Sequence, residues 1–328
     1  MKKDLQQLLK SQFRKIRLEE PLSKHSTFGV GGKADAYIEV DDLDPKSPKS
    51  LQAIIKFCKK TPTKPSQTIP FYIVGGGSNI LFHDKGFRGL IIKLTANKID
   101  IQKSKKTVKA EAGAILAKLI KETSAKGLDN LAAWTGIPGT VGGAVRGNAG
   151  ANGLETRDVL LKAEILNTKT GKTTSLNPKK LEMSYRHSNL KDDPTMIVLS
   201  ATFHLSKLTP EALAKIQEKA KQARATQPPG RTAGSFFKNP DPTERKKLPK
   251  NIPLAAGYLI DQCNLKGHKI GGVQISDVHA NFFQNRNVKT KPATQKDLLA
   301  LAKLAKQKVQ KKFNITLQEE VQIVPPEL

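Results

Sequence analysis

The positions of apolar residues along the chain predict a mixture of helices and strands. Apolar periodicity or a strongly helix-forming composition predicts helices in five segments: 5–16, 51–60, 115–127, 210–224 and 295–313. Alternating or continuous apolar runs predict strands at 36–40, 71–74, 79–82, 89–94, 107–113, 162–176, 195–205 and 315–324. Strands dominate the middle of the chain, so we expect an α+β fold without internal repeats.

The helix predicted at 295–313 has clear boundaries and a clear apolar face. Thr294 and Asp297 form a loose capping box at its start. Its stripe, which we expect to be buried, comprises Leu298, Leu301, Ala302, Ala305 and Val309. The first predicted helix has one apolar face made of Leu5, Leu8, Leu9, Phe13 and Ile16.

The last predicted strand, 315–324, places acidic residues on opposite faces. By the period of two, Glu319 shares a face with the apolar residues Leu317 and Val321. Glu320 falls on the other, polar face. We therefore expect Glu320 to point toward a polar space, which is either a solvated face or a site.

Three consecutive glycines, Gly75, Gly76 and Gly77, follow the strand at 71–74. Glycine gives up side-chain packing and costs conformational entropy, so such a run is favoured where backbone N–H groups approach phosphate oxygens. The dinucleotide-binding fingerprint fits poorly, because Ile80 occupies its third glycine position and the following residues read as a strand. A plain tight turn is the alternative.

A second glycine-rich stretch spans residues 135–153. Its seven glycines are Gly136, Gly139, Gly142, Gly143, Gly147, Gly150 and Gly153. With so little side chain, we expect this stretch not to build a core. Two such stretches roughly 60 residues apart, each beside apolar strands, favour one extended phosphate-bearing ligand that the backbone contacts at two places.

The chain is strongly basic, but its charge is spread out. Of 328 residues, 56 are lysine or arginine and 29 are aspartate or glutamate, which gives a net charge of +27. Neither an RNA-binding aromatic motif nor zinc-finger spacing is present. We therefore interpret the charge as a solvated surface that would attract anionic ligands to a cleft, not as a nucleic-acid interface.

Cysteine and histidine usage indicates neither a disulfide framework nor a metal site. Cys58 and Cys263 are far apart and belong to no CxxC pair, which favours a reducing compartment. The six histidines show no metal-ligand spacing. No apolar run approaches the length of a membrane span, and the basic N-terminus lacks the apolar core of a secretory signal. We expect a cytoplasmic protein without a metal.

Two further polar residues stand in unusual surroundings. Arg186 follows Tyr185 in SYRHSNL, just before a loop. Ser235 lies between Gly234 and two phenylalanines, yet not in a G-x-S-x-G elbow, because Phe237 replaces the closing glycine. Taken singly, the arginine reads as a surface residue, and the serine as either a turn residue or a hydroxyl aimed into a pocket.

In their order along the chain and in their residues, these segments resemble the UDP-N-acetylenolpyruvoylglucosamine reductase family, flavoproteins of peptidoglycan precursor synthesis. The matching segments are IVGGGSNILFHDKGFRGLII, GIPGTVGGAVRGNAGANGLE, YRHS, AGSFFKNP, AGYLIDQCNLKGHKIGGVQIS and FNITLQEEV. They run from about His25 to Ile323, which is nearly the whole chain. A series in this order is far more specific than any single glycine motif.

The resemblance implies a two-subdomain FAD-binding fold of the PCMH/vanillyl-alcohol-oxidase type, followed by a smaller α+β substrate-binding domain. We expect the FAD subdomains at 1–67 and 68–206 and the substrate domain at 207–328, where the composition changes. FAD would be bound without a covalent link. The residues that the resemblance places against it are Gly75, Gly76, Gly77, Ser78, Asn79, Ile80, Pro138, Gly139, Gly142, Gly143, Asn148 and Gly150.

In that family NADPH reduces the FAD, and the reduced flavin delivers hydride to the enolpyruvyl ether of a UDP sugar, which gives UDP-N-acetylmuramate. Arg186 matches the arginine that stabilises negative charge developing toward the substrate carboxylate. Glu320 matches the carboxylate that works with it, and Ser235 matches the general acid that protonates the neighbouring carbon. The implied substrate-binding residues are Tyr185, Lys238, Asn239 and His279.

Two positions depart from the family pattern. Asn152 stands where an aromatic residue is usual in the flavin wall, and Glu319 stands where proline is usual. Arg186 and Ser235 are 49 positions apart, and the chain stops eight residues after Glu320. These lengths resemble the shorter subtype of the family, which lacks a long insertion with a tyrosine that closes on the substrate.

Two rival functions stay open on sequence alone. In another flavoprotein of the same fold, one that oxidises an alcohol, Arg186, Ser235 and Glu320 would have no shared task. A basic nucleic-acid-binding protein would account for the charge and for nothing else. We therefore expect a monomeric, NADPH-dependent flavin oxidoreductase acting on UDP-N-acetylglucosamine enolpyruvate, without a nucleic-acid or membrane partner.

Overall fold

The computed structural model describes residues 7, 9–11, 13, 15–60, 68–225 and 227–325. Contacts within the chain divide it into two compact units. Unit 1 comprises Met1–Glu19, Asp35–Gly76 and Arg88–Arg224, and unit 2 comprises Glu20–Ala34, Gly77–Phe87 and Ala225–Leu328. Each unit is thus assembled from three segments that are far apart in the sequence.

This division differs from the three domains expected from the sequence. Unit 1 takes most of the two expected FAD subdomains, and also helix α6 (Pro210–Ala225) up to Arg224, which the sequence had assigned to the third domain. Unit 2 adds two short segments, 20–34 and 77–87, to the C-terminal part of the chain. The finer three-domain division stays a prediction.

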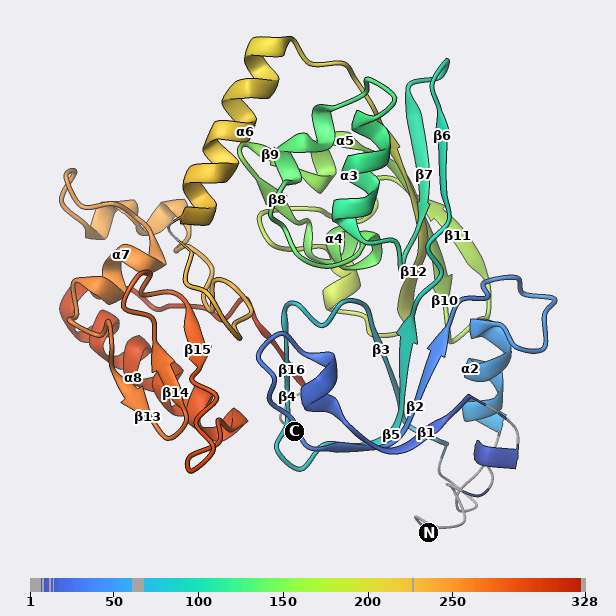
Figure 1. The fold of residues 1–328 in the computed structure, drawn as a ribbon, viewed down its shortest axis with the longest axis horizontal. Helices are drawn as coiled ribbons and strands as arrows, with labels where there is room; N and C mark the ends of the chain where they lie inside the picture. The colour runs from blue at the N-terminus through green and yellow to red at the C-terminus, as the bar shows by residue number, and fades with distance from the viewer. Residues whose placement is uncertain are drawn as a thin grey trace. The chain divides into compact units, whose positions relative to one another are not determined.

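Two sheets form most of unit 1 (Figure 1). A four-stranded sheet has the order β1-β2-β5-β3, with β1 (Arg17–Pro21), β2 (Lys33–Val40), β3 (Phe71–Val74) and β5 (Phe87–Leu94). A five-stranded antiparallel sheet has the order β11-β10-β12-β7-β6, with β6 (Ile99–Gln102), β7 (Thr107–Glu111), β10 (Leu160–Asn167), β11 (Thr173–Leu176) and β12 (Met196–His204). A short hairpin joins β8 (Gly150–Ala151) to β9 (Leu154–Glu155).

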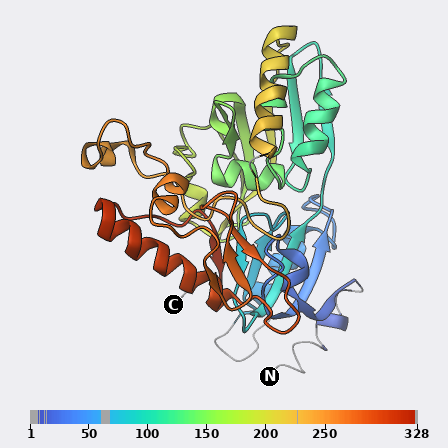
Figure 2. The same cartoon turned by 60° about the vertical axis from the view of Figure 1, so that its left-hand side comes forward.

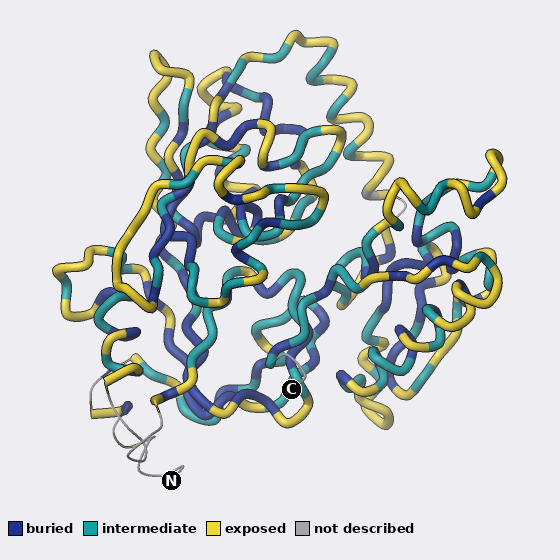
Figure 3. Tube along the Cα trace, turned by 180° about the vertical axis from the view of Figure 1, so that it is seen from behind, coloured by how far each residue is buried: buried dark blue, intermediate teal, exposed yellow. Residues whose placement is uncertain are grey.

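Short helices surround these sheets. They are α2 (Leu51–Lys60), α3 (Leu116–Ser124), α4 (Val141–Gly147), α5 (Thr156–Val159) and the 3-10 helices η2 (Asn130–Trp134) and η3 (Asn189–Lys191). α3 and α4 lie on the same side of the five-stranded sheet (Figure 1), and Trp134 packs edge-on against Phe203 of β12 at 5.6 Å between ring centroids. In contrast, α6 has no buried position among its described residues (Figure 3).

The second glycine-rich stretch does contribute to the core of unit 1, so the expectation from the sequence was wrong on this point. α4 lies within that stretch, and its residues Val141, Ala144 and Val145 are buried. A Cβ on Gly142 would lie 3.0 Å from the Cβ of Ala112. The glycine therefore allows the helix to approach the neighbouring strand closely enough for three small apolar residues to be buried.

Unit 2 contains a three-stranded antiparallel sheet of β13 (Lys269–Ile270), β14 (Val273–Ile275) and β15 (Phe283–Asn285), and a parallel pair of β4 (Ile80–Phe82) and β16 (Gln322–Val324). Its helices are α7 (Ala256–Asp261), α8 (Gln295–Phe313) and the 3-10 helices η1 (Leu22–His25) and η4 (Pro242–Lys247). α8 runs along the three-stranded sheet (Figure 2). Phe236 stacks on Phe283 at 4.5 Å in the core of the unit.

The longest predicted helix is confirmed with the same bounds, 295–313. Both bonds of its capping box are present: the Asp297 N–H donates to Thr294 Oγ1 at 3.0 Å, and the Thr294 N–H donates to Asp297 Oδ2 at 3.2 Å. All five residues of its predicted stripe are buried. In the first predicted helix Leu9 and Phe13 are buried, whereas Leu5 and Leu8 lie outside the described residues.

The terminal strand was predicted too long. Only 322–324 form β16, and the residues before it make single bonds to a neighbouring segment, such as Lys238 N–H to Gln318 O at 2.9 Å. The expected alternation still holds for Leu317 and Val321, which are buried. Among the described residues no helix is long and apolar enough to cross a membrane.

Gly77→Ala is expected to destabilise the protein strongly. A Cβ at Gly77, whose φ is +68°, would lie 1.9 Å from the carbonyl oxygen of His25. We expect the free energy of unfolding to fall by at least about 3 kcal/mol, measured by urea denaturation followed by circular dichroism.

Gly127→Ala is the matched control. Gly127 has nearly the same φ, +71°, but a Cβ there would meet no atom within 4 Å. Only backbone strain of about 1 kcal/mol then remains. Equal losses in the two variants would show that the His25 carbonyl does not constrain Gly77.

Candidate active site

The two glycine-rich stretches lie against each other in unit 1. A Cβ on Gly75 would lie 2.6 Å from Thr140 Oγ1, and a Cβ on Gly76 would lie 3.1 Å from the Cα of Gly139. Side chains at these positions would separate the turn after β3 from the start of α4. The structure thus brings together the two segments that the sequence had assigned to one ligand.

The turn after β3 also offers hydrogen-bond donors. In the part of the chain that the structure describes, the backbone N–H groups of Gly75, Gly76, Gly77 and Asn79 donate no hydrogen bond. Gly77 is buried and Gly75 and Asn79 are half-buried. N–H groups in such positions are nearly always paired, so donors without a protein acceptor in one turn are typical of a phosphate-binding turn. These residues therefore fit the pyrophosphate of FAD.

Gly77 has a second reason to be glycine, which the sequence did not reveal. It lies in unit 2 against the carbonyl oxygen of His25, and the Thr27 N–H donates to Gly77 O at 3.2 Å. Close by, Ser26 Oγ donates to Ile80 O at 2.8 Å, three residues after Gly77. The close approach of two backbone segments, in addition to any ligand, excludes a side chain at Gly77.

Asn148 holds the second glycine-rich stretch in place. Its Nδ2 donates to Glu155 Oε2 at 2.9 Å and to Ser184 O at 2.7 Å, and its Oδ1 accepts from the Arg157 N–H at 2.9 Å. The residue is fully buried and has a positive φ of 44°. The polar atoms of its side chain are thus bonded within unit 1. Only its backbone would be available for the expected contact with FAD.

Asn152, which departs from the family pattern, has a structural explanation. Asn152 and Gly153 join β8 to β9 in a two-residue hairpin turn, and both have positive φ, 52° and 86°. Asn-Gly is the preferred sequence of such turns, because both residues tolerate the left-handed conformation. Asn152 Nδ2 also donates to Ala133 O at 2.9 Å. The Asn-Gly pair was visible in the sequence and would have predicted this hairpin.

Arg186 lies at the tip of a tight turn in unit 1. Ser184 and His187 exchange two backbone hydrogen bonds of 3.1 Å, and Arg186 between them has a φ of +55°. This conformation is uncommon for arginine and marks a held position. Arg186 Nη2 donates to Gly150 O at 3.1 Å, and the guanidinium lies 5.1 Å from the ring centroid of Tyr185.

Ser235 belongs to unit 2 and is held through its neighbours. The Phe236 N–H donates to Asn281 O at 2.7 Å, and the side chain of Asn281 accepts from the Phe237 N–H at 3.0 Å and donates to Phe237 O at 2.8 Å. Ser235 itself pairs with Phe282. Asn281 is buried, and no sequence signal had singled it out. The half-buried hydroxyl of Ser235 forms no hydrogen bond among the described residues.

Glu320 lies beside the segment that carries Ser235. Its N–H donates to Phe236 O at 2.9 Å, and its carbonyl oxygen accepts from Asn79 Nδ2 at 3.0 Å. The neighbouring Glu319 pairs instead with Lys306 of α8, at 2.9 Å and 3.1 Å. This ion pair explains why a carboxylate stands on the apolar side of the terminal segment.

The expected substrate-binding residues of unit 2 surround the same segment. Lys238 continues it, and Asn239 Oδ1 accepts from the Ala256 N–H at 3.1 Å, at the start of α7. His279 Nδ1 accepts from the Asn281 N–H at 3.2 Å, which places the proton of the neutral ring on Nε2. Burial lowers the pKa of His279, so the ring is neutral at pH 7.

The structure divides the predicted catalytic residues between the units. Ser235 and Glu320 lie together in unit 2, and Arg186 belongs to unit 1. Of the other predicted residues, Tyr185, Pro138 and Gly143 are exposed in unit 1. Among the described residues no group of three or more histidines, cysteines, aspartates and glutamates is placed to hold a metal ion.

Comparisons with known proteins cover nearly the whole chain. A family model described as FAD binding domain matches residues 43–177, and one described as UDP-N-acetylenolpyruvoylglucosamine reductase, C-terminal domain, matches residues 225–324. The UDP-N-acetylenolpyruvoylglucosamine reductase of Rubrobacter xylanophilus is 36% identical over 317 residues, which is 96% of this chain and 97% of that protein. The protein of the same name from Bacillus subtilis is 33% identical over 326 residues, 99% of each chain.

The fold agrees with these matches. The crystal structure of the UDP-N-acetylenolpyruvylglucosamine reductase of Thermus caldophilus superposes with a TM-score of 0.72 at 29% sequence identity. The match covers 94% of this chain and 100% of the Thermus caldophilus chain. The expected α+β architecture, an FAD-binding fold followed by a substrate-binding domain, is confirmed. The chain belongs to the UDP-N-acetylenolpyruvoylglucosamine reductase family.

Proposed function

We propose that this chain reduces UDP-N-acetylglucosamine enolpyruvate to UDP-N-acetylmuramate, with FAD as cofactor and NADPH as reductant, in peptidoglycan precursor synthesis. Family membership over nearly the full length supports this reaction. The structural observation that carries it is the contact of the two glycine-rich stretches, with Gly75 and Gly76 against Thr140 and Gly139. This arrangement suits a dinucleotide cofactor that is held largely by backbone groups.

FAD, when bound, would supply the hydride transfer from NADPH to the substrate, and the protein would supply the environment for that transfer. Backbone N–H groups of the turn Gly75–Asn79 would hold its pyrophosphate. Gly139 and Gly150 belong to the second wall, which Asn148 holds in place through Glu155. Ser78, Ile80, Pro138, Gly142 and Gly143 complete the proposed cofactor site.

Three side chains perform the proposed chemistry on the substrate. Arg186 offers a guanidinium to the substrate carboxylate, where negative charge develops as hydride adds to the alkene. Glu320 works with it at that carboxyl group. Ser235 donates its hydroxyl proton to the neighbouring carbon, and this proton is not engaged in a hydrogen bond to any described residue. The strained φ of Arg186 supports a functional position for that residue.

The remaining proposed contacts recognise the UDP sugar. Lys238 contributes positive charge beside Ser235, and Tyr185 contributes an exposed ring beside Arg186. His279 donates from Nε2, because its Nδ1 is already occupied by the Asn281 N–H. Asn239 is positioned by its bond to α7.

We propose that the enzyme works as a cytoplasmic monomer without a nucleic-acid partner. Both cysteines are free, and burial raises the pKa of the Cys58 thiol to about 12, which keeps that thiol protonated. Free thiols are typical of a reducing compartment. The net charge of +27 suits the anionic substrates NADPH and UDP sugar.

The visible absorption spectrum tests the proposed reaction directly. The purified protein is expected to be yellow, to bleach with anaerobic NADPH, and to recolour when the enolpyruvyl UDP sugar is added. Recolouring only with oxygen would favour an oxidase of the same fold. A colourless protein that cannot be loaded with FAD would contradict the proposal.

Ser235→Ala is expected to leave bleaching by NADPH unchanged and to slow recolouring by the UDP sugar at least about 100-fold, because the proton donor is lost. Stopped-flow absorbance measures both steps separately. Ser206→Ala, which removes another half-buried hydroxyl in unit 1, is the control and should change neither step. If Ser235→Ala recolours as fast as the unmodified protein, the serine is not the acid.

Asn79→Ala is expected to retain FAD, since the backbone N–H remains, but to slow recolouring about ten-fold. The reason is that Glu320 O loses the amide that holds it at 3.0 Å. FAD content and stopped-flow absorbance distinguish the two effects. Asn130→Ala removes a similar bond, from Nδ2 to His204 O, in η2, which carries none of the proposed site residues, and serves as control. Loss of FAD with an unchanged recolouring rate would contradict a positioning role.

A further inference from the structure

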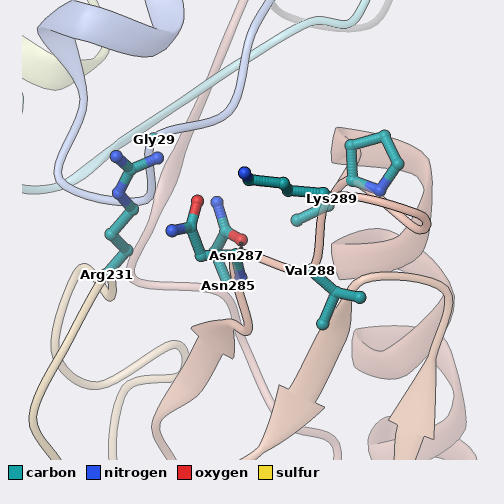
Figure 4. Close-up of a pocket in the computed structure, with 8 residues that line it drawn as sticks. Gly29, Arg231, Asn285, Asn287, Val288 and Lys289 are labelled. Atoms are coloured by element: carbon teal, nitrogen blue, oxygen red, sulfur yellow. Dashed lines mark hydrogen bonds between the residues drawn. The ribbon is translucent and has the colours of Figure 1, made fainter.

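Unit 2 contains a cavity of about 260 Å³ that none of the proposed contacts uses (Figure 4). Its polar lining comes from Arg231, Asn285, Asn287 and Lys289, with Gly29 opposite Arg231. We call it the cationic cavity, because its lining includes two basic residues and no carboxylate among the described residues.

The cavity is shaped to seat Arg231. Gly29 has a φ of +65°, and a Cβ there would lie 2.8 Å from both Cδ and Nη1 of Arg231. The backbone of Arg231 is fixed at the same time, because its carbonyl oxygen accepts from the Asn285 N–H at 2.9 Å. Glycine at position 29 therefore leaves the space that the guanidinium occupies.

Asn285 provides the floor of the cavity. Its Nδ2 donates to Phe28 O at 2.9 Å, and its Oδ1 accepts from the Asn287 N–H at 2.7 Å. Both ends of this amide are thus used inside the protein. They fix Asn287 and the start of the loop that carries Lys289.

Three donor groups remain for a ligand. The guanidinium of Arg231, the ammonium of Lys289 and the side-chain amide of Asn287 form no hydrogen bond or ion pair among the described residues. Figure 4 shows the Lys289 side chain directed toward the two amides, with the Arg231 guanidinium on their other side, beside Gly29. Two positive charges and a neutral donor around a small cavity match a phosphate group, which offers several strong acceptors and up to two negative charges.

The position of the cavity relative to Ser235 indicates which ligand carries that phosphate. Arg231 and Ser235 lie on one segment and pair with Asn285 and Phe282, respectively. Four positions separate them along the chain, which limits the distance between their Cα atoms to at most about 14 Å. Lys238, the proposed contact of the UDP sugar, lies on the other side of Ser235 along the same segment. The cavity therefore suits a phosphate of a different ligand that reaches the same centre.

We propose that the cationic cavity binds the 2′-phosphate of NADPH, the group that distinguishes NADPH from NADH. This inference rests on the proposed function for the identity of its ligand. Arg231 and Lys289 make the charged contacts to the phosphate, and Asn287 adds a neutral one. The cavity is then the element that selects the reductant.

Calorimetric titration of the FAD-loaded protein tests the site without turnover. Adenosine 2′,5′-bisphosphate is expected to bind more tightly than adenosine 5′-monophosphate. Arg231→Gln and Lys289→Gln should each weaken the bisphosphate about ten-fold and leave the monophosphate unchanged, because each removes one charged contact to the extra phosphate. Lys303→Gln removes an exposed charge of α8 outside the cavity and is the control. Equal binding of the two nucleotides by the unmodified protein would overturn the proposal.

Anaerobic bleaching by NADPH and by NADH provides the second readout. The two cavity variants should lose roughly ten-fold in rate at low NADPH, keep their rate with NADH, and recolour normally with the UDP sugar. Slower recolouring together with unchanged nucleotide preference would assign the cavity to the UDP diphosphate and overturn the proposal. If neither nucleotide bleaches the unmodified protein, the proposed function fails, and the calorimetric comparison still decides whether the cavity recognises a 2′-phosphate.

Discussion

The close approach of Gly77 to the carbonyl oxygen of His25 is the constraint on which unit 2 depends. Around this contact the chain makes backbone bonds from Thr27 to Gly77, and Asn79 continues them to the terminal segment by donating to Glu320 O. Segments that are distant in the sequence are thereby fixed in one register. Residues 231–238, which we call the serine segment, bond to the same terminal residues through Phe236 and Lys238, so the relative placement of Ser235 and Glu320 follows from this packing.

Neutral amide side chains, rather than ion pairs, position the site. Asn79 holds Glu320, Asn148 holds the second glycine-rich stretch, and Asn281 holds the residues after Ser235. An amide can donate and accept at once, so one buried residue satisfies several backbone groups without the desolvation cost of a charge. Each of these three asparagines therefore fixes the backbone next to a proposed site residue without adding a charge of its own.

Much of this architecture could be predicted from the sequence. The bounds of helix 295–313 were predicted correctly because its buried stripe and its capping box are local sequence patterns. The glycine, serine and arginine motifs identified the family. α4 could not be predicted, because glycines that permit close packing look the same in the sequence as glycines of a loop. The pairing of Asn79 with Glu320 joins residues 241 positions apart, and no periodic pattern records such a contact. Asn281 was missed for the same reason. The hairpin turn at Asn152-Gly153, in contrast, could have been predicted from its Asn-Gly sequence.

The segmented composition of unit 2 has a consequence for the order of events during synthesis. Residues 20–34 and 77–87 leave the ribosome early, but their partners, the serine segment and β16, are made only near the end of translation. Unit 1 has all of its segments once residue 224 has emerged. A vectorially made chain can therefore complete unit 1 first, while β4 must wait with an unpaired edge for β16. The glycine turn that joins the two units is made before either can close.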